Sequence, residues 1–376
     1  MVRTIKIAYL MHVDWNWAKQ RPHFVYEQLS KKYKVDLYSI KNMFRNSKLA
    51  VNPIENVSGE SYIVKKAPFS GRNNLSKRIE KLSNKKVIQK LLCTDYDLVW
   101  ITSPVMLHFI PIELIQNRKV IYDCMDDYLA FSVNQRRIEL HLAYEKKLVS
   151  ISTAVITTSN LLKKRILERY GVHIEAEKIQ VVNNAMNGDW LNEHTKKTNN
   201  VSRYVEEELY TVVYVGTIGD WIDFESLHYV LQQNLKVRFK FIGPIEIKVK
   251  DHVHPRLEFL GPVSHVELPH LLHSGDAFIM PFIKNELIEA VNPVKLYEYI
   301  LFNKPIFAIK YDEIEKFKPF VSLYNDKVEL CRLIERHTNV ANNIALPDDK
   351  QRIEFLKEHT WETRMEQIYK VIEETV

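Results

Sequence analysis

The sequence is poor in the residues that build disulfide frameworks and metal centres. Its three cysteines, Cys93, Cys124 and Cys331, are widely spaced, with no CxxC pair and no histidine cluster. We therefore expect buried thiols in a reducing cytoplasm rather than a disulfide frame or a zinc site. No apolar run approaches the roughly 18 residues of a membrane span, and the chain leads directly into a strand-like run. We expect neither a spanning helix nor a signal peptide.

Two further absences narrow the class of protein. The chain contains no GxGxxG fingerprint, which disfavours a nicotinamide dehydrogenase. Its basic stretches are not interleaved with aromatic residues, and it carries no known nucleic-acid motif. Nucleic acid is therefore not an expected partner.

What the chain does have is length and an uneven charge. Its 376 residues, 46% of them hydrophobic and 27% charged, are enough for two globular domains. Residues 1–165 hold 28 Lys+Arg and 14 Asp+Glu, a net charge of +14, whereas residues 166–376 carry a net −8. The basic first part predicts a polyanionic or anionic membrane partner.

Strands and helices alternate along most of the chain, which predicts an α/β fold with parallel sheets. The polar, apolar-poor stretch at 193–208 is typical of a linker. We therefore predict a first domain over 1–192 and a second over 209–350. The last segment, 351–376, is expected to be helical.

The most informative stretch runs from Asn292 to Ile309. Asn292 is expected to cap a buried helix that begins at Pro293 and ends near Phe302. Lys295 and Glu298 lie three residues apart and share one face of that helix. A helix end with a nearby lysine predicts a phosphate site, and the glutamate could accept hydrogen bonds from a ribose. The alternative is a capped core helix with a surface Lys–Glu pair.

Polar groups also follow several predicted strands, where open α/β sheets bind ligands. Two adjacent carboxylates, Asp126 and Asp127, end the predicted strand at 120–124 and need a partner or a function. The alternative for these carboxylates is a helix cap, and the alternative for His12 and His23, which lie near the first strand, is ordinary loop hydrogen bonding. His12 and Asp14 lie in the loop after the predicted strand at 5–10, and Arg21 and His23 open the next helix. In the second domain, the turns after two predicted strands hold Gly216, Thr217, Gly219 and Gly243, where glycine would let the backbone approach a ligand closely.

Residues 65–90 combine dense positive charge with apolar residues at helical spacing. The apolar positions are Leu75, Ile79, Leu82, Val87 and Leu91. Such a segment suits adsorption on an anionic membrane. A solvated basic face is the alternative.

The stretch from Asn292 resembles the donor-binding motif of GT-B glycosyltransferases, especially the retaining family 4 group. Its Asn-Pro-x-Lys-Leu-x-Glu-Tyr pattern, followed by Asn-Lys-Pro and an apolar strand, carries the resemblance. Bacterial enzymes of teichuronic-acid, capsule and exopolysaccharide assembly are the most similar members. The resemblance implies two Rossmann-like, doubly wound domains facing a cleft, with the final helix crossing back to the first domain.

The resemblance also implies an activity and a set of residues. A nucleotide-diphosphate sugar, with UDP as the default, would donate a hexosyl group to a lipid-linked or polysaccharide acceptor. No cofactor or metal is expected. The protein would be cytoplasmic or peripheral on the inner membrane face. Catalytic roles would fall to Asp126, Asp127 and Lys295, and acceptor contacts to His12, Asp14, Arg21 and His23. Donor contacts would come from Gly216, Thr217, Gly219, Gly243, Val263, Asn292, Pro293, Val294, Lys295, Leu296 and Glu298.

Two positions depart from the family pattern. Asp220-Trp-Ile-Asp223 stands where many members place an arginine and a lysine for the diphosphate. The family's first glutamate would fall on Ala290, whereas this chain has Glu289 one position away. A nucleotide-sugar 2-epimerase of the same fold and a catalytically silent membrane-surface assembly subunit remain as alternatives.

Overall fold

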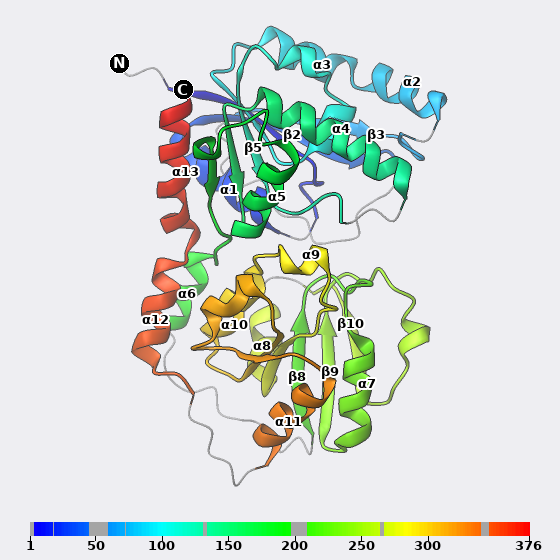
Figure 1. Cartoon of the computed structure of the whole chain (residues 1–376), viewed down its shortest axis with the longest axis vertical. Coiled ribbons are helices and arrows are strands. Elements are labelled where there is room, and N and C mark those ends of the chain that lie inside the picture. The colour runs from blue at the N-terminus through cyan, green and yellow to red at the C-terminus, as the bar shows by residue number, and fades with distance from the viewer. Residues whose placement is uncertain are drawn as a thin grey trace. The chain divides into compact units, whose positions relative to one another are not determined.

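The computed structural model describes residues 4–17, 19–44, 59–71, 73–130, 134–196, 209–263, 267–339 and 346–376. The chain forms two compact units (Figure 1). Unit 1 comprises Met1–Asn183 and Arg364–Val376, and unit 2 comprises Asn184–Thr363. The boundary between the units lies after Asn183, whereas the sequence analysis placed the end of the first domain at residue 192. Residues 193–196 of the predicted linker belong to a helix, and 197–208 lie outside the described residues.

Unit 1 is built on a seven-stranded parallel sheet in the order β3-β2-β1-β4-β5-β6-β7. The chain moves outward from β1 on one side and then restarts at β4 on the other. The boundary between β1 and β4 is therefore the switch point at which such sheets bind ligands. The strands are β1 Lys6–Met11, β2 Lys34–Asn42, β3 Ser61–Lys66, β4 Leu98–Ile101, β5 Lys119–Cys124, β6 Ala154–Thr157 and β7 Ile179–Val181.

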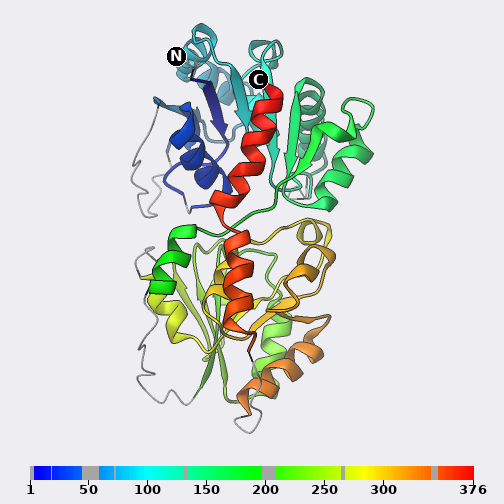
Figure 2. The same cartoon turned by 90° about the vertical axis from the view of Figure 1, so that its left-hand side faces the viewer.

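Helices cover both faces of this sheet. The final helix α13 packs beside α1, where Lys32 pairs with Glu373 at 3.0 Å and the Tyr369 hydroxyl donates to the Gln28 carbonyl at 3.1 Å (Figure 2). The helices of this unit are α1 Arg21–Lys32, α2 Asn74–Ser83, α3 Lys85–Cys93, α4 Gln135–Ile151, α5 Asn160–Tyr170 and most of α13 Trp361–Thr375.

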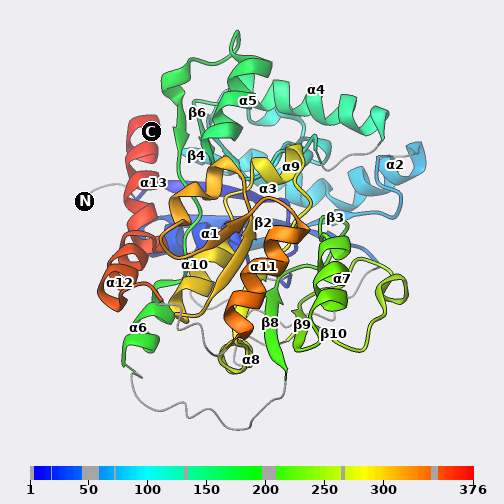
Figure 3. The same cartoon turned by 60° about the horizontal axis from the view of Figure 1, so that its bottom comes forward.

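Unit 2 repeats the design with a six-stranded parallel sheet in the order β10-β9-β8-β11-β12-β13. Its switch point lies between β8 and β11. Figure 3 shows α7 and α11 side by side, joined by the Lys327–Glu225 ion pair. The strands are β8 Tyr210–Val215, β9 Val237–Ile242, β10 Leu257–Gly261, β11 Ala277–Met280, β12 Ile306–Ile309 and β13 Ser322–Tyr324. The helices are α6 Gly188–Lys196, α7 Phe224–Gln233, α8 Leu268–Ser274, α9 Glu286–Glu289, α10 Val294–Leu301, α11 Lys327–Thr338 and α12 Asp349–Glu358.

Two edge strands were not predicted: β3 exposes half of its residues, and β13 has only three residues. The segment expected to be one helix from residue 351 is two helices, α12 and α13, which are separated at His359 and Thr360. Among the described residues, no helix combines the length and the apolar character that a membrane crossing requires.

Candidate functional site

The unit 2 switch point is lined by two glycine turns that pack backbone against backbone. Gly216 follows β8 with φ 155°, and Gly243 follows β9 with φ 143°. A Cβ atom added to Gly243 would lie 2.1 Å from the Gly216 carbonyl oxygen. A side chain at Gly243 would therefore force the turns apart, whereas a Cβ atom on Gly216 would lie 2.7 Å from the Tyr214 hydroxyl. Gly216 and Thr217 are half-buried, and the Gly216 and Ile218 amides donate to the Ile242 and Pro244 carbonyls at 2.9 and 2.8 Å.

The rest of that turn is held by two aromatic side chains that the sequence analysis did not single out. The Tyr214 hydroxyl donates to the Thr217 carbonyl at 3.0 Å. A Cβ on Gly219 would lie 2.5 Å from the Trp221 ring, so the indole covers this glycine. Farther along the sheet, Val263 is half-buried and packs against the unit 2 core.

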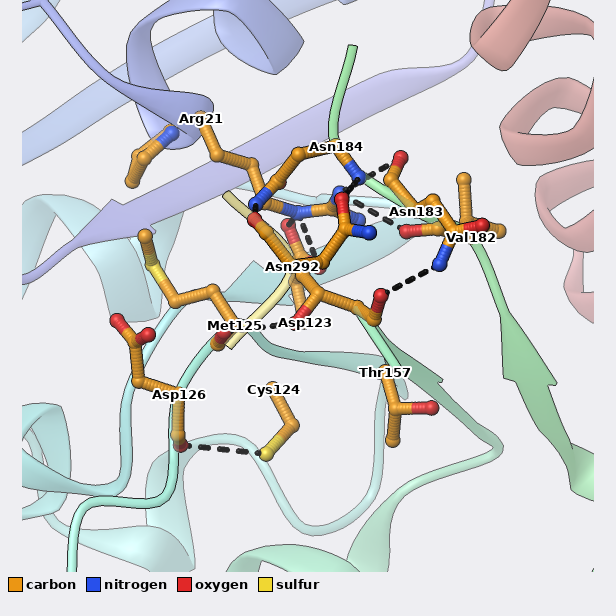
Figure 4. A network of polar contacts seen from close by, with 12 residues as sticks. Arg21, Asp123, Cys124, Met125, Asp126, Thr157, Val182, Asn183, Asn184 and Asn292 are labelled. Carbon is orange, nitrogen blue, oxygen red and sulfur yellow. Dashed lines mark hydrogen bonds and ion pairs between the residues drawn. The ribbon is translucent and has the colours of Figure 1, made fainter. Parts of the chain in front are cut away.

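Helix α10 begins at Val294, after Pro293 as the cap residue, and no side chain caps it. The prediction that Asn292 caps this helix is wrong, because its side chain is used elsewhere. Its Oδ1 accepts from the Asn184 amide at 2.9 Å, and its Nδ2 donates to Glu313 Oε1 at 3.0 Å. Its carbonyl also accepts from Asn184 Nδ2 at 2.7 Å (Figure 4). The amides at the start of α10 are therefore not capped by Asn292.

A second contact ties α10 to the glycine turn. The Tyr299 hydroxyl accepts from the Val215 amide at 2.7 Å, although it lies in the middle of the helix and is fully buried. Its ring stacks on Phe278 of β11, with ring centroids 4.6 Å apart. Tyr299 thus connects α10 with the last residue of β8 and with β11. The Glu-Tyr pair of the sequence motif was the available signal for this role.

Lys295 and Glu298 form an ion pair at 2.7 Å on the face of α10. The glutamate side chain is 11% exposed and the lysine side chain 32%. The pair fits the alternative of a surface ion pair, and it also keeps a cation within the first turn of an uncapped helix. Of the remaining motif residues, Leu296 is fully buried in the core, Pro293 is buried and Val294 is half-buried.

The unit 1 switch point holds a neutral histidine. His12 follows β1, and its Nδ1 lies 2.7 Å from the hydroxyl of Thr102, which follows β4. Its ring packs edge-on against Tyr128 at 5.5 Å. Burial lowers the pKa of His12 to about 3, with a smaller contribution from His23, so the imidazole is uncharged at neutral pH.

Asp126 and Asp127, predicted together, occupy different environments. Asp127 is 3% exposed and bridges Arg165 at 2.9 Å and Arg169 at 2.8 Å. Burial opposes ionisation, but the two arginines hold the pKa of Asp127 below its usual value. The two ion pairs give Asp127 a structural role, and its catalytic role stays a prediction.

Asp126 is half-buried, and burial raises its pKa to about 6 against the opposing field of Arg21. Figure 4 shows its carboxylate directed away from the Arg21–Asp123 pair. A carboxyl group in this state can exchange a proton near neutral pH. Asp126 is thus the carboxyl candidate at this edge of the sheet.

Arg21 also has a structural role, and its predicted acceptor contact stays a prediction. It is 1% exposed and pairs with Asp123 at 2.9 Å, while its other guanidinium nitrogen donates to the Val182 carbonyl at 3.0 Å (Figure 4). This ion pair joins the start of α1 to β5 and to the end of β7. Sequence alone gave no signal for the pairing, because the two residues are 102 positions apart.

His23 and Asp14 shape the loop after β1. His23 is 1% exposed, its Nε2 lies 3.1 Å from the Trp15 carbonyl, and burial lowers its pKa to about 4. Asp14 accepts a hydrogen bond from the Asn16 amide at 3.0 Å. Of the predicted acceptor-side residues, His12 and Asp14 remain half-buried, whereas Arg21 and His23 are buried. Among the described residues, no group of three or more His, Cys, Asp or Glu side chains could hold a metal ion.

No protein-family model matches the chain. One similar protein is TuaH of Bacillus subtilis (strain 168), which carries a provisional assignment as a teichuronic acid biosynthesis glycosyltransferase. The two are 23% identical over 255 residues, 61% of this chain and 64% of TuaH. The chain therefore spans less than two thirds of the length of this relative.

Two solved structures are similar over nearly the whole chain. Anabaena Alr3699/HepE, in complex with UDP and glucose, has a TM-score of 0.66 and 15% identity, and the match covers 98% of this chain and 99% of HepE. Sucrose-phosphate synthase (tll1590) from Thermosynechococcus elongatus has a TM-score of 0.71 and 14% identity, with coverage of 99% and 100%. These likenesses concern the fold.

Proposed function

We propose that this chain, which has the fold of the GT-B glycosyltransferases, transfers a hexosyl group from a nucleotide-diphosphate sugar to an acceptor hydroxyl. The main support for this proposal is the arrangement of residues at the unit 2 switch point. There the glycine turn after β8 and the uncapped start of α10 are held together by Tyr299, with Lys295 in the first turn. Backbone amides, the helix dipole and a lysine are the groups that bind a diphosphate.

In this proposal, donor binding redirects an existing ion pair. Lys295 would exchange its 2.7 Å contact with Glu298 for the diphosphate, and the freed carboxylate would accept hydrogen bonds from the ribose. UDP is the proposed nucleotide, because HepE is described with UDP and with UDP-glucose. TuaH supports a lipid-linked or polysaccharide acceptor in cell-surface glycan synthesis. Such an acceptor would place the reaction in the cytoplasm, at the inner membrane face.

The reaction is a substitution at the anomeric carbon. The acceptor oxygen forms a bond to that carbon, the bond to the diphosphate oxygen breaks, and its electron pair leaves with the nucleoside diphosphate. Lys295 and the start of α10 would stabilise the charge that develops on the leaving group. Asp126, largely ionised above pH 6, is the proposed acceptor of the hydroxyl proton. We propose retention of configuration, as in the family that the motif resembles.

The test is transfer from a panel of UDP-sugars to bacterial lipid extracts, with product configuration read by NMR. Lys295→Ala should lower the rate by roughly 10²–10³, the usual effect of losing one preorganised donor to a developing charge. Lys236→Ala is the matched control, because this exposed lysine precedes β9 at the opposite edge of the same sheet. Full activity of Lys295→Ala would refute the assignment. Conversion of the donor sugar without any acceptor would instead identify an epimerase.

A further inference from the structure

Helix α2 of unit 1 buries its polar side chains and exposes its apolar ones. Ser76 and Glu80, one turn apart, are 5% and 4% exposed. Leu75, Ile79 and Leu82 recur at i, i+4 and i+7, so they form one stripe, and they are 68%, 40% and 75% exposed. A surface helix normally turns its apolar stripe toward the core. The reversed arrangement indicates that the stripe meets something outside the chain.

Hydrogen bonds fix this orientation. Glu80 Oε1 accepts from the Ala67 amide at 2.9 Å, and its Oε2 lies 2.9 Å from His108 Nε2. The Ser76 hydroxyl donates to the Pro68 carbonyl at 2.9 Å. Rotating α2 to bury the stripe would break all three contacts and would leave the buried Ala67 amide without its acceptor, which is costly. The outward stripe is therefore built into the domain.

The surface around the stripe is strongly basic. Helices α2 and α3 carry six Lys or Arg residues and one carboxylate, the buried Glu80. In the described part of the chain, five of the six are exposed and make no ion pair; Lys90, the sixth, pairs with Glu60 at 3.1 Å. Figure 1 shows α2 and α3 following one another along the outside of unit 1. The five are Lys77, Arg78, Lys81, Lys85 and Lys86.

A second apolar side chain adjoins α2. Phe69, in the turn before the helix, is 67% exposed and has φ 56°, a conformation that bulky residues rarely adopt. Phe69, Leu75, Ile79 and Leu82 are therefore large exposed apolar side chains that lie beside the basic residues. We name these four residues and the five free cations the α2 surface.

We propose that the α2 surface docks on an anionic lipid bilayer, with α2 lying in the plane of the headgroups. The aliphatic stripe would enter the acyl boundary, and the lysines and arginine would contact anionic headgroups. Single-stranded nucleic acid fits less well, because base stacking needs repeated aromatic side chains and the stripe is aliphatic apart from Phe69. The inference concerns unit 1 alone and does not depend on the proposed sugar transfer.

Flotation with lipid vesicles tests the proposal on the full-length chain. We expect binding to vesicles of 70% phosphatidylcholine and 30% phosphatidylglycerol, weakened by salt, and little binding to pure phosphatidylcholine. Lys77→Glu with Lys81→Glu should weaken binding about thirtyfold, since each removed cation contributes roughly fivefold. Leu75→Ser with Leu82→Ser should weaken it at least about tenfold through lost apolar insertion.

Matched controls come from exposed positions of unit 2. Leu235 and Val253 are 77% and 76% exposed, so Leu235→Ser with Val253→Ser removes equal apolar exposure elsewhere. Lys236→Glu with Lys250→Glu reproduces the charge change. Unchanged binding of both controls supports the proposal. It is overturned if the wild-type chain fails to float with anionic vesicles, if the controls lose as much binding, or if single-stranded RNA binds while vesicles do not. The flotation assay contains no donor sugar, so a chain that does not bind vesicles could still transfer sugar. Likewise, a chain without transferase activity could still bind vesicles.

Discussion

The substitution Asn292→Asp separates two roles for this residue, which lies just before α10: a helix cap, or a member of the hydrogen-bond network with Asn184 and Glu313. An N-cap would tolerate it, because aspartate caps helices as well as asparagine and its charge favours a helix start. In the structure, however, Nδ2 of Asn292 donates to Glu313 Oε1 at 3.0 Å. The substitution replaces that donor with an oxygen and sets two carboxylates against each other.

The size of the effect follows from that distance. Two unit charges about 3 Å apart repel by roughly 5 kcal/mol at an effective dielectric constant of 20. Lys316, 2.9 Å from the same Glu313 oxygen, and relaxation of the side chains offset part of this. We expect a net loss of about 3 kcal/mol, which corresponds to a fall of roughly 6 to 12 °C in the melting temperature of a unit of this size.

Thermal unfolding monitored by tryptophan fluorescence measures this loss, with Glu313→Gln as the compensating change. The amide in Glu313→Gln can donate to the new carboxylate, so the double variant should recover most of the lost stability. Hydrogen exchange of the Asn184 amide, which Asn292 Oδ1 holds at 2.9 Å, reports the same site directly. An unchanged or raised melting temperature for Asn292→Asp alone would refute the network and restore the capping role.

Two further predictions concern unit 1. Asp127→Asn should lower the free energy of unfolding by about 3 to 5 kcal/mol, because it leaves the Arg165 and Arg169 charges without their shared carboxylate. Asp126→Asn should leave stability nearly unchanged or improved at neutral pH. Urea unfolding compares the two variants, and equal losses would contradict the different roles of the two carboxylates. His12 has a folded pKa of about 3 and an ordinary unfolded value near 6.5, so its contribution is fully present above pH 6.5 and is lost as the pH falls toward 3. His12→Gln should therefore remove about 2 kcal/mol of the stability lost between pH 7 and pH 5, and identical pH profiles for variant and wild type would count against a buried neutral imidazole.

The parts of the fold that follow from local pattern were predictable. Apolar runs such as Lys6–Met11 and Ala277–Met280 mark central strands, and their alternation with helices specifies two parallel sheets. Two of the four edge strands, β3 and β13, were not predicted, and β3 shows why, because it exposes half of its residues and carries two lysines. An edge strand needs only one partner and one buried face, so its sequence is less constrained.

Side-chain partners were the unpredictable part of the site. Asn292 has a capping residue's sequence context, but Asn184 and Glu313, 108 and 21 positions away, claim its polar atoms. Arg21 and Asp123 likewise find each other across 102 positions. Such pairs form only when the sheets assemble, so they cannot be predicted from local sequence propensity. The α2 segment shows the same limit: its period predicted an amphipathic helix, but only the bonds of buried Glu80 reveal which face turns outward.

The hydroxyl that joins the middle of α10 to the end of β8 has a mechanical consequence. Tyr299, bonded to Val215 and stacked on Phe278, holds α10 against the ends of β8 and β11. Under the proposed function, a diphosphate would meet a helix start already fixed against the sheet, and Lys295 would exchange its ion pair with Glu298. A new donor preference would then arise in the loops around this core rather than at the tyrosine.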